Sequence, residues 1–588
     1  MSSVPENASR ALPRVRSDVP SRWQWFKNSA ATFLLAATFF GCLARVLLRE
    51  KAKLTNDKIV LSLAHWQLEP GVTKGFDEMA RRYNEVRRAR GETDIEFRQM
   101  PIPEGAYSQW VTTQLMGGTA PDLIEIGQMS YDTILRFHAR YFTPVTREIF
   151  KPNPYNAGTS EEGRAWKETF VDGLGEGIPA LQEYYDIGLS SFSCRMFYNR
   201  ELLKTLTRKL VAQGKLDKEL SAPPDDLREF LSLCDKLHEL TDDSGRPYLP
   251  IAGSPDRFNL INWLTISPLS APLLTEVDDN CDGFANDTET FFAILRNRLR
   301  FDDPRLKKMQ AITREVTRRL QPGWNSVTRD EAVMLFVQQR SLFIGAGSWD
   351  GMTLIKQAAE APKPFAVDIT QFPMIYPGDP EWGDLSWGRP YERPETQFSF
   401  GMTKMSKHPE VVLDFLRFLT SQKRNQEFNE IIGWIPVVRG AETSQFLRVF
   451  KPNLHGVLSG YSPILGARTQ TFMNQTNPNL WIGEDSNGKA FGVQEWCDRM
   501  NERWLTEAFV DFEQRDEAYR DQLASKETVL ATTRAKVLLN SDPQMTQYLQ
   551  QRYNGAFDPP VDAIRDIARS RQLLQDARAE ARKQGRLK

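Results

Sequence analysis

The first part of the chain alternates short apolar runs with segments in which apolar residues recur every three or four positions. Residues 59–65 (IVLSLAH) form a continuous apolar run, which predicts a buried strand. The following segment, 72–83, carries apolar residues at helical spacing and predicts a helix. The pair recurs as a strand at 94–97 and a helix at 107–115, and a third apolar run follows at 120–126. This β-α-β-α-β alternation favours a parallel sheet with right-handed crossovers, and therefore an α/β fold.

Patterning in the rest of the chain predicts a second set of strands and helices. Apolar runs predict strands at residues 192–199, 246–251, 365–373, 398–403 and 431–437. Asp225 is placed to cap one helix, and Pro409 to start another. From Trp496 to Lys588 the pattern predicts charged helices, with few core positions beyond about residue 558.

Residues 334–350 (MLFVQQRSLFIGAGSWD) combine both patterns. They predict the end of a helix, a polar turn, a short strand, and then small residues that lead to Trp349 and Asp350 at the start of a new helix. A helix N-terminus presents free backbone N–H groups, here beside an aromatic side chain. We therefore expect a ligand-binding corner at this stretch.

Composition narrows the class of protein. The 588 residues are 40% hydrophobic and 26% charged, which is typical of a globular chain long enough for two or three domains. Lys plus Arg (75) nearly equals Asp plus Glu (76), which gives no support for a nucleic-acid-binding protein. The five cysteines form no CxxC or zinc-type spacing, and none of the five histidines is paired at ligand spacing. A zinc hydrolase is not expected, and these residues predict no cofactor.

The N-terminal end carries the features of an export or anchoring signal. Residues 1–28 are polar and basic, and residues 29–48 are apolar except for Arg45. Its uninterrupted part, residues 29–44, is sixteen residues long, which is short for a membrane-spanning helix of about 20 residues. The side chain of Arg45 can extend toward the membrane surface, which lets the apolar segment reach residue 48. We favour a signal peptide or a membrane anchor. Cys42 follows Phe-Phe-Gly, a degraded form of the lipoprotein cleavage motif, so lipidation at Cys42 stays an alternative.

Five phrases, in order along the chain, resemble the family-1 extracellular solute-binding proteins of ABC importers, the family of maltose-binding protein. They are Ala120-Pro121-Asp122 before an apolar strand, a strand ending in Tyr198-Asn199, the stretch from Phe336 to Trp349, a strand ending at Pro373, and the Gly-x-Ile-Pro of residues 433–436. The chain departs from the family at Asp225-Asp226, where Thr-Trp is usual. The resemblance spans about residues 58–550 and implies a protein that binds a solute outside the cytoplasm.

The resemblance implies two α/β lobes joined by hinge strands, similar to the type II periplasmic-binding-protein fold. Lobe 1 is expected to comprise residues 58–192 and 372–430, and lobe 2 residues 193–371 and 431–550, followed by a charged helical tail at 551–588. The strand at 365–373 is expected to return to lobe 1, and residues 431–437 to cross back to lobe 2. The lobes are expected to close on a ligand by rotation, since contacts from both form only in the closed state.

The candidate ligand-binding residues are side chains at predicted strand ends, where open parallel sheets place their ligand crevice. They are Trp66, Glu125 and Gln128 in lobe 1, Trp263, Trp349 and Asp350 in lobe 2, and Trp434 near the hinge. Aromatic faces suit the C–H-rich faces of sugar rings, while carboxylates and amides suit the hydroxyls. The resemblance implies a stacking role for Trp349, whereas Trp263 suits the core equally well, and Glu125 also suits a hinge or core role.

Residues 278–289 (DDNCDGFANDTE) match the spacing of a calcium-binding loop. Oxygen ligands would come from Asp278, Asn280, Asp282 and Glu289, with a turn at Gly283. No helix is predicted to lead into the loop, because Pro268 and Pro272 interrupt the preceding segment. We favour an Asp- and Gly-rich surface turn, and calcium binding stays the alternative.

These observations favour the substrate-binding component of an ABC importer, on the periplasmic or extracellular face and tethered to the cytoplasmic membrane. It would bind a carbohydrate between its lobes and contact the permease subunits. The alternative is a membrane-anchored sensor or scaffold with the same fold, since the N-terminal segment and the C-terminal tail are unusual for a freely diffusing receptor. A glycosidase would need two carboxylates about 5 to 9 Å apart, one with a raised pKa. No motif singles out such a pair among the 76 acidic residues, so an enzyme is not predicted.

Overall fold

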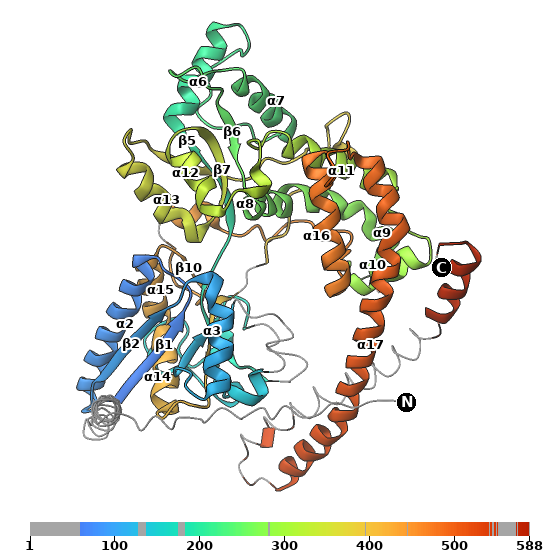
Figure 1. The fold of residues 1–588 in the computed structure, drawn as a ribbon. Helices are drawn as coiled ribbons and strands as arrows, with labels where there is room; N and C mark the ends of the chain where they lie inside the picture. Colours follow the sequence, from blue (N-terminus) through green and yellow to red (C-terminus); the bar gives the residue numbers. More distant parts are fainter. Residues whose placement is uncertain are drawn as a thin grey trace, which may run out of the picture.

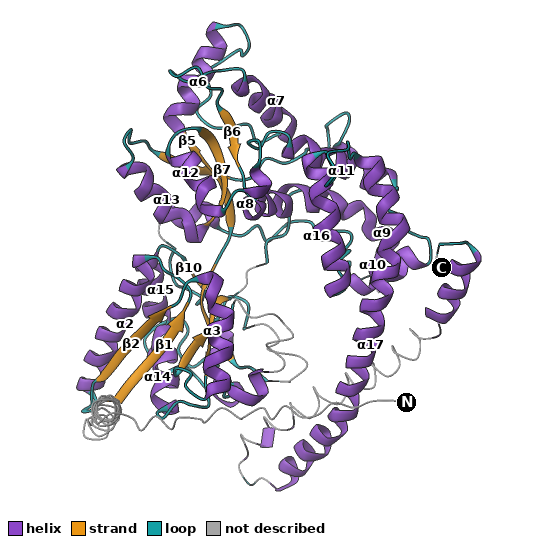
Figure 2. Cartoon of the chain, viewed as in Figure 1, coloured by secondary structure: helices purple, strands orange, loops and turns teal. Residues whose placement is uncertain are grey.

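Two α/β lobes and a helical unit make up the protein in the computed structural model (Figure 1, Figure 2). The structure describes residues 59–127, 137–174 and 183–539 except 280, 282, 394, 395 and 444, and then 541, 543, 546, 547, 550, 572 and 574–586. The predicted segments 1–28 and 29–48, with Cys42, lie outside the described residues, as do Gln128 and most of the predicted tail. Within the described part, no helix is long and apolar enough to cross a membrane.

The first lobe is built on a six-stranded mixed sheet in the order β10-β4-β9-β3-β1-β2. The strands are β1 (Ile59–His65), β2 (Ile95–Pro101), β3 (Leu123–Glu125), β4 (Asp186–Ser191), β9 (Gln397–Met402) and β10 (Ile435–Pro436). β1 pairs in parallel with β2 and β3, whereas β9 is antiparallel to β3 and β4. The predicted β-α-β-α-β alternation at the start of this lobe is therefore confirmed.

Helices cover both faces of the first sheet. They are α2 (Pro70–Ala89), α3 (Glu104–Gly117), α14 (Pro409–Leu419) and α15 (Gln422–Ile432), with the short α5 (Thr146–Ile149), η1 (Pro154–Asn156) and η2 (Trp166–Thr169). On one face, Phe76 of α2 packs against Phe400 of β9 and Phe428 of α15. On the other face, Tyr107 of α3 packs in a second cluster with Ile124 of β3. A parallel core covered on both faces explains why β1 and β3 are nearly continuous apolar runs.

The second lobe has a four-stranded sheet in the order β6-β7-β5-β8. Its strands are β5 (Cys194–Asn199), β6 (Leu249–Ala252), β7 (Ser341–Gly347) and β8 (Val367–Thr370), and its helices are α6 (Arg200–Ala212), α7 (Leu227–His238), α8 (Pro255–Ile261), α12 (Arg329–Val337) and α13 (Ser348–Glu360). The expected cap at Asp225 is wrong by one residue, because Asp226 accepts the N–H of Glu229 and caps α7. The carboxylate of Asp225 instead pairs with Arg389.

A helical unit extends the second lobe on the side away from α13 (Figure 1). Its elements are η3 (Asn262–Ile266), η4 (Ser267–Leu273), α9 (Leu274–Val277), α10 (Asp287–Leu295), α11 (Pro304–Thr317), α16 (Ala467–Ile482) and the 47-residue α17 (Val493–Leu539). Three short helices lie between the longer elements along the chain: η5 (Trp324–Ser326), η6 (Gly383–Leu385) and η7 (Gln445–Phe450). Trp496 and Trp504 of α17 are fully buried and pack edge-on against Phe301, which joins this helix to the core of the second lobe.

Residues 365–373 were predicted to lead back to the first lobe, with the lobe boundary at residue 372, but the chain stays in the second lobe beyond that residue. β8 pairs antiparallel with β5, and Phe372 and Ile375 beyond it are buried in the core of the second lobe. The chain enters the first sheet only at β9. The prediction was wrong because β8 is a short edge strand. Its neighbour in the sheet is determined by long-range hydrogen bonds, which the apolar pattern does not reveal.

The predicted crossing at residues 431–437 is also wrong. β10 pairs antiparallel with β4 in the first sheet, and Trp434 and Val437 are buried in the core of the first lobe. The chain re-enters the second lobe later, where Leu447 and Phe450 of η7 pack with Phe197 of β5. A strand of two residues leaves almost no signal in the sequence, so the pattern could not show to which lobe it belongs.

Candidate ligand-binding site between the lobes

Two parallel strands of the first lobe end beside each other and present a carboxyl group. Trp66 follows β1 directly, and Glu125 is the last residue of β3. The backbone N–H of Trp66 donates to Oε2 of Glu125 at 3.2 Å, and the hydroxyl of Tyr107 donates to the Glu125 carbonyl at 2.8 Å. Only 2% of the Glu125 side chain is exposed. The structure thus places Trp66 and Glu125 side by side at the ends of neighbouring strands, and their role in ligand binding stays a prediction.

Burial perturbs the acids at this edge of the sheet. Burial raises the pKa of Glu125 to about 8, and hydrogen bonds from Trp66 and Gln67 offset only part of that effect. The pKa of Glu69, four residues after the end of β1, is also raised by burial. Arg329 and Asp350 act on the same carboxyl with opposite signs, and both belong to the second lobe. Glu69 therefore lies within electrostatic range of the opposite lobe.

The second lobe contributes a buried ion pair at the start of α13. Nη1 of Arg257, on α8, donates to Oδ2 of Asp350 at 2.5 Å and to the Gly345 carbonyl at 3.4 Å. The Arg257 side chain is 1% exposed, while Asp350 is partly exposed. α8 and α13 begin directly after β6 and β7, which are parallel neighbours, so the two side chains meet at one edge of the sheet.

Several buried polar atoms at these strand ends have no hydrogen-bond partner among the described residues. They are Nε1 of Trp66 and Oε2 of Glu69 in the first lobe, and Nε and Nη2 of Arg257 in the second. A buried donor or acceptor without a partner costs about 1 to 3 kcal/mol, and native proteins satisfy nearly all such groups. Donors and acceptors from both lobes are thus left for a ligand or for ordered water.

Trp349 lies where the lobes meet, with its ring against the first crossing segment. The ring packs edge-on against Phe192 at 5.4 Å between centroids, and Phe192 packs edge-on against Trp434 at 4.8 Å. A Cβ at Gly347 would lie 2.3 Å from the Trp349 ring, so this position requires glycine for the indole to fold back over the backbone. Trp434 is 2% exposed and belongs to the core of the first lobe. In this structure Trp349 and Trp434 pack against the hinge.

A comparison of the sequence with the profiles of protein families identifies the family of this chain. The profile of bacterial extracellular solute-binding proteins matches residues 78–448, more than half of the chain. The chain belongs to that family. The family resemblance found in the sequence is therefore confirmed, and an extracellular family implies an extracytoplasmic location.

Solved structures of other solute-binding proteins share the fold at low sequence identity. The solute-binding protein RafE in complex with raffinose is 13% identical, with a TM-score of 0.50, and covers 77% of this chain and 100% of its own. A chitin oligosaccharide binding protein is 14% identical with a TM-score of 0.49, covering 77% of this chain and 100% of its own. The maltodextrin-binding domain MalE from Bdellovibrio bacteriovorus, bound to maltotriose, is 14% identical with a TM-score of 0.46, covering 78% and 99%. At this identity the likeness concerns the fold alone. A search of curated proteins finds no matching sequence.

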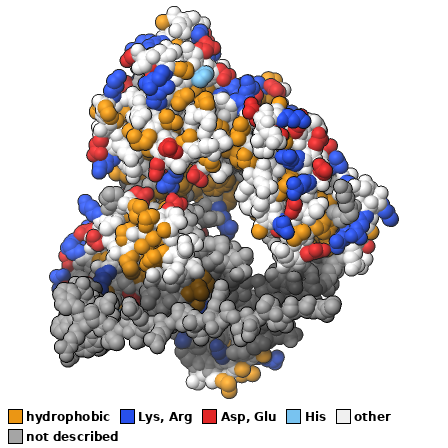
Figure 3. Space-filling model, in the orientation of Figure 1, with side chains coloured by type: hydrophobic (Ala, Val, Ile, Leu, Met, Phe, Trp, Pro, Cys, Tyr) orange, Lys and Arg blue, Asp and Glu red, His pale blue; other side chains and the backbone are white. Residues whose placement is uncertain are grey.

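Among the four tryptophans that the sequence of this solute-binding protein predicts to contact ligand, only Trp263 has a well-exposed side chain, at 52%. It lies on η3, immediately after the helix that carries Arg257. Gln128 lies outside the described residues. The surface is hollowed where the two lobes and the helical unit face one another (Figure 3).

Sequence reasoning missed Glu69 and Arg257. Glu69 lies in the same strand-to-helix connection as Trp66, so the rule that selected Trp66 could also have selected it. Arg257 follows the end of β6 by five residues in an equivalent connection. Its pairing with Asp350 joins positions 93 residues apart, which apolar patterning does not reveal.

The loop whose spacing matches a calcium site, residues 278–289, contributes two residues to a helix cap. Asn286 and Glu289 form a reciprocal capping box at the start of α10, and the Glu289 carboxylate also accepts the N–H of Asp279. Asp279 pairs with Arg298. No cluster of metal-binding side chains occurs among the described residues, which do not include Asn280 and Asp282. Calcium binding at this loop stays the alternative to the surface turn that the sequence favours.

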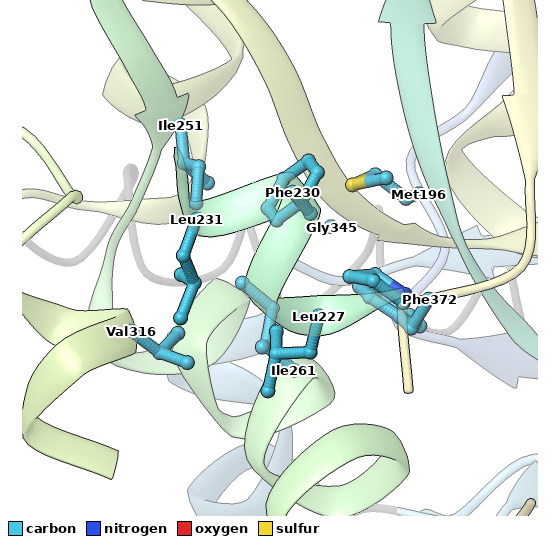
Figure 4. Close-up of a pocket in the computed structure, with 10 residues that line it drawn as sticks. Met196, Leu227, Phe230, Leu231, Ile251, Ile261, Val316, Gly345 and Phe372 are labelled. Carbon is cyan, nitrogen blue, oxygen red and sulfur yellow. The ribbon is translucent and has the colours of Figure 1, made fainter. Parts of the chain in front are cut away.

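A small apolar cavity lies inside the second lobe, apart from these polar groups (Figure 4). Met196, Phe230, Leu231, Ile251 and Val316 are among its lining residues. These side chains come from β5, α7, β6 and α11 and offer no hydrogen-bonding group. The cavity is a packing gap between the sheet and its helices rather than a site for a polar solute.

Proposed function

We propose that this protein is the receptor of an ABC importer and that it binds a carbohydrate between its lobes. The observation that carries the proposal is the set of unpartnered buried groups on facing strand ends. Glu69 offers an acceptor, while Trp66 and Arg257 offer donors. Sugar hydroxyls donate and accept at once, so one polyhydroxylated ligand could satisfy all three groups.

Aromatic side chains at the same ends support this ligand class. Trp66 is partly exposed beside Glu125, and Trp263 is exposed on the opposite lobe. Flat aromatic rings contribute apolar contact while the polar groups fix orientation. RafE, whose structure was solved in complex with raffinose, is similar to this chain in fold, which supports the proposal.

The mechanism we propose is closure by rotation of one lobe toward the other. A ligand that touches Glu69 and Arg257 together binds the closed state more tightly than the open state, and it shifts the equilibrium by that difference in affinity. The permease would then recognise the closed form. The predicted segment at 29–48 would tether the receptor to the membrane.

Thermal unfolding of the full-length chain against mono- and oligosaccharides, polyols and amino acids tests the proposal. A ligand at a hundredfold excess over its dissociation constant stabilises the native state by about 2.7 kcal/mol, which corresponds to a shift of about 2 °C for a chain of this size. Glu69→Gln should reduce the shift, whereas the matched control Glu85→Gln, on the exposed side of α2, should retain it. No shift with any saccharide would refute carbohydrate binding.

One observation favours the second candidate, a sensor or scaffold. Two helices of the helical unit, α16 and α17, lie beyond residue 448, where the family match ends, and they pack on the second lobe. The two roles separate in cells: an importer receptor is required for uptake of the ligand that shifts the unfolding temperature. Uptake that persists after deletion of the gene would favour the sensor.

A further inference from the structure

A fully buried arginine connects distant segments at the base of the hinge. Arg195 of β5 has no exposed surface, and its Nη1 pairs with Oε2 of Glu392 at 3.0 Å. Nε donates to the carbonyl of Val449 at 2.8 Å, and Nη2 donates to the carbonyl of Lys451 at 2.6 Å. The hydroxyl of Ser193 accepts from Nη1 at 2.7 Å and donates to Glu392 at 2.7 Å. One guanidinium thus holds three stretches of chain that are far apart in sequence.

These three stretches are the ends of the three crossings between the lobes. Ser193 stands between β4 of the first sheet and β5 of the second. Glu392 ends the second-lobe part of the connection from β8 to β9, and by Thr396 the chain bonds to Asp172 of the first lobe. Val449 and Lys451 follow the third crossing, from β10 to η7. The backbone N–H of Glu392 donates to the carbonyl of Asn453 at 2.8 Å, which ties the second and third crossings directly.

The same network reaches the candidate binding residues. The carbonyl of Ser193 accepts the N–H of Ser348 at 2.8 Å, and Ser348 is the first residue of α13. Trp349 and Asp350 follow it directly. Because Gly347 offers no side-chain cap, this bond is a main attachment of the α13 N-terminus.

We propose that Arg195, Ser193 and Glu392 form a clasp that joins the three crossings into one rigid base and holds the N-terminus of α13 in place. Lobe rotation then bends the chain on the first-lobe side of the clasp, beginning at Phe192 in the first crossing. Arg195 and Glu392 are positioning residues, because they reach the ligand-binding groups only through Ser193 and Ser348. Only the assignment of Trp349 and Asp350 to the ligand site rests on the proposed function; the clasp itself does not depend on it.

Hydrogen exchange of the ligand-free, full-length protein tests the clasp. Arg195→Lys keeps the charge but loses the planar fork, so a single ammonium cannot bond Glu392, Val449 and Lys451 together. We expect about tenfold faster exchange in four segments at once: residues 192–195, 390–393, 449–453 and 348–351. The matched control is Arg200→Lys, which alters an exposed arginine paired with Asp368 beside β5.

Acceleration confined to the segment that carries the substitution, or equal in Arg195→Lys and Arg200→Lys, would overturn the clasp. Should Arg195→Lys not fold, Ser193→Ala carries the same test, because it removes the bridging hydroxyl without leaving a charge unpaired. Ligand titration of the same variants separates the two proposals. Failure of every ligand on the wild type refutes the binding function and leaves the exchange result intact, whereas joint acceleration with unchanged ligand affinity overturns the positioning role.

Discussion

Replacing Glu125 by glutamine should make the stability of the protein less sensitive to pH. Burial raises the pKa of this carboxyl from 4.5 to about 8. Between these two values the native state keeps the proton while the unfolded state releases it. The unfolded state then binds fewer protons, so wild-type stability falls as pH rises. A glutamine has the same shape, can still accept the N–H of Trp66, and cannot ionise.

The size of the effect follows from proton linkage. One proton bound only in the native state changes the free energy of unfolding by about 1.4 kcal/mol for each pH unit. The stability of Glu125→Gln relative to wild type should therefore rise by about 1.4 kcal/mol per unit from pH 5 to pH 8. It should level off at both ends, with a total on the order of 5 kcal/mol.

Urea unfolding of both proteins at half-unit pH steps measures this difference. The control is Glu85→Gln, which removes a solvent-exposed carboxyl of α2 and should follow the wild-type curve at every pH. Curves for Glu125→Gln and wild type that stay parallel from pH 5 to pH 8 would show that Glu125 is ionised in the native state. That result would refute the conclusion that burial of the Glu125 carboxyl at the strand ends of the first lobe raises its pKa.

Three further substitutions test other parts of the structure. Gly433→Ala places a Cβ 2.3 Å from Cγ of Met352 across the contact between the lobes, at a residue whose backbone φ is 76°. We expect weaker ligand binding because of the clash, and a lower melting temperature because of the strained backbone. Adding Met352→Ala to the same chain should restore ligand binding but not the melting temperature. Leu231→Ala enlarges the apolar cavity and should cost about 3 to 5 kcal/mol in urea unfolding, and a loss under 1 kcal/mol would contradict the packing described for the second lobe. Arg257→Met leaves Asp350 without its buried partner and should lower the free energy of unfolding by about 3 to 5 kcal/mol. Adding Asp350→Asn should recover part of that loss. Strictly additive effects of the two substitutions would mean that the pair does not interact.

Local patterning was sufficient to predict the alternating strands and helices at the start of the first lobe, from β1 to β3. β1 and α2 appeared as a buried run and a helical repeat because both faces of the sheet are covered and the helix has one apolar side. The two crossings that were misplaced involve β8 and β10, whose partners lie more than a hundred residues away. Their assignment depends on hydrogen bonds that leave no periodic trace in the sequence.

Only the site residues that lie at or just after the end of a predicted strand could be predicted from the sequence. Trp66 and Glu125 were found in this way, and the structure places them in contact through a backbone hydrogen bond. Trp434 carried the same signal, yet its ring is buried against Phe398 and Phe192. An indole is apolar enough for the core and polar enough for a ligand site, so its type does not distinguish the two. Arg195 and Glu392 were invisible because their pairing joins residues 197 positions apart.

The length of α17 gives the second lobe a lever. Its first turns are anchored by Trp496, Trp504 and Phe512, and the remainder projects beyond that core (Figure 1). At about 1.5 Å of rise per residue, the part beyond Phe512 is about 40 Å long. Each degree by which the second lobe turns would sweep the far end of a rigid rod of that length through about 0.7 Å, so a rotation of some tens of degrees would displace it by more than the width of a helix. A partner attached at the far end would sense the angle between the lobes without touching either of them.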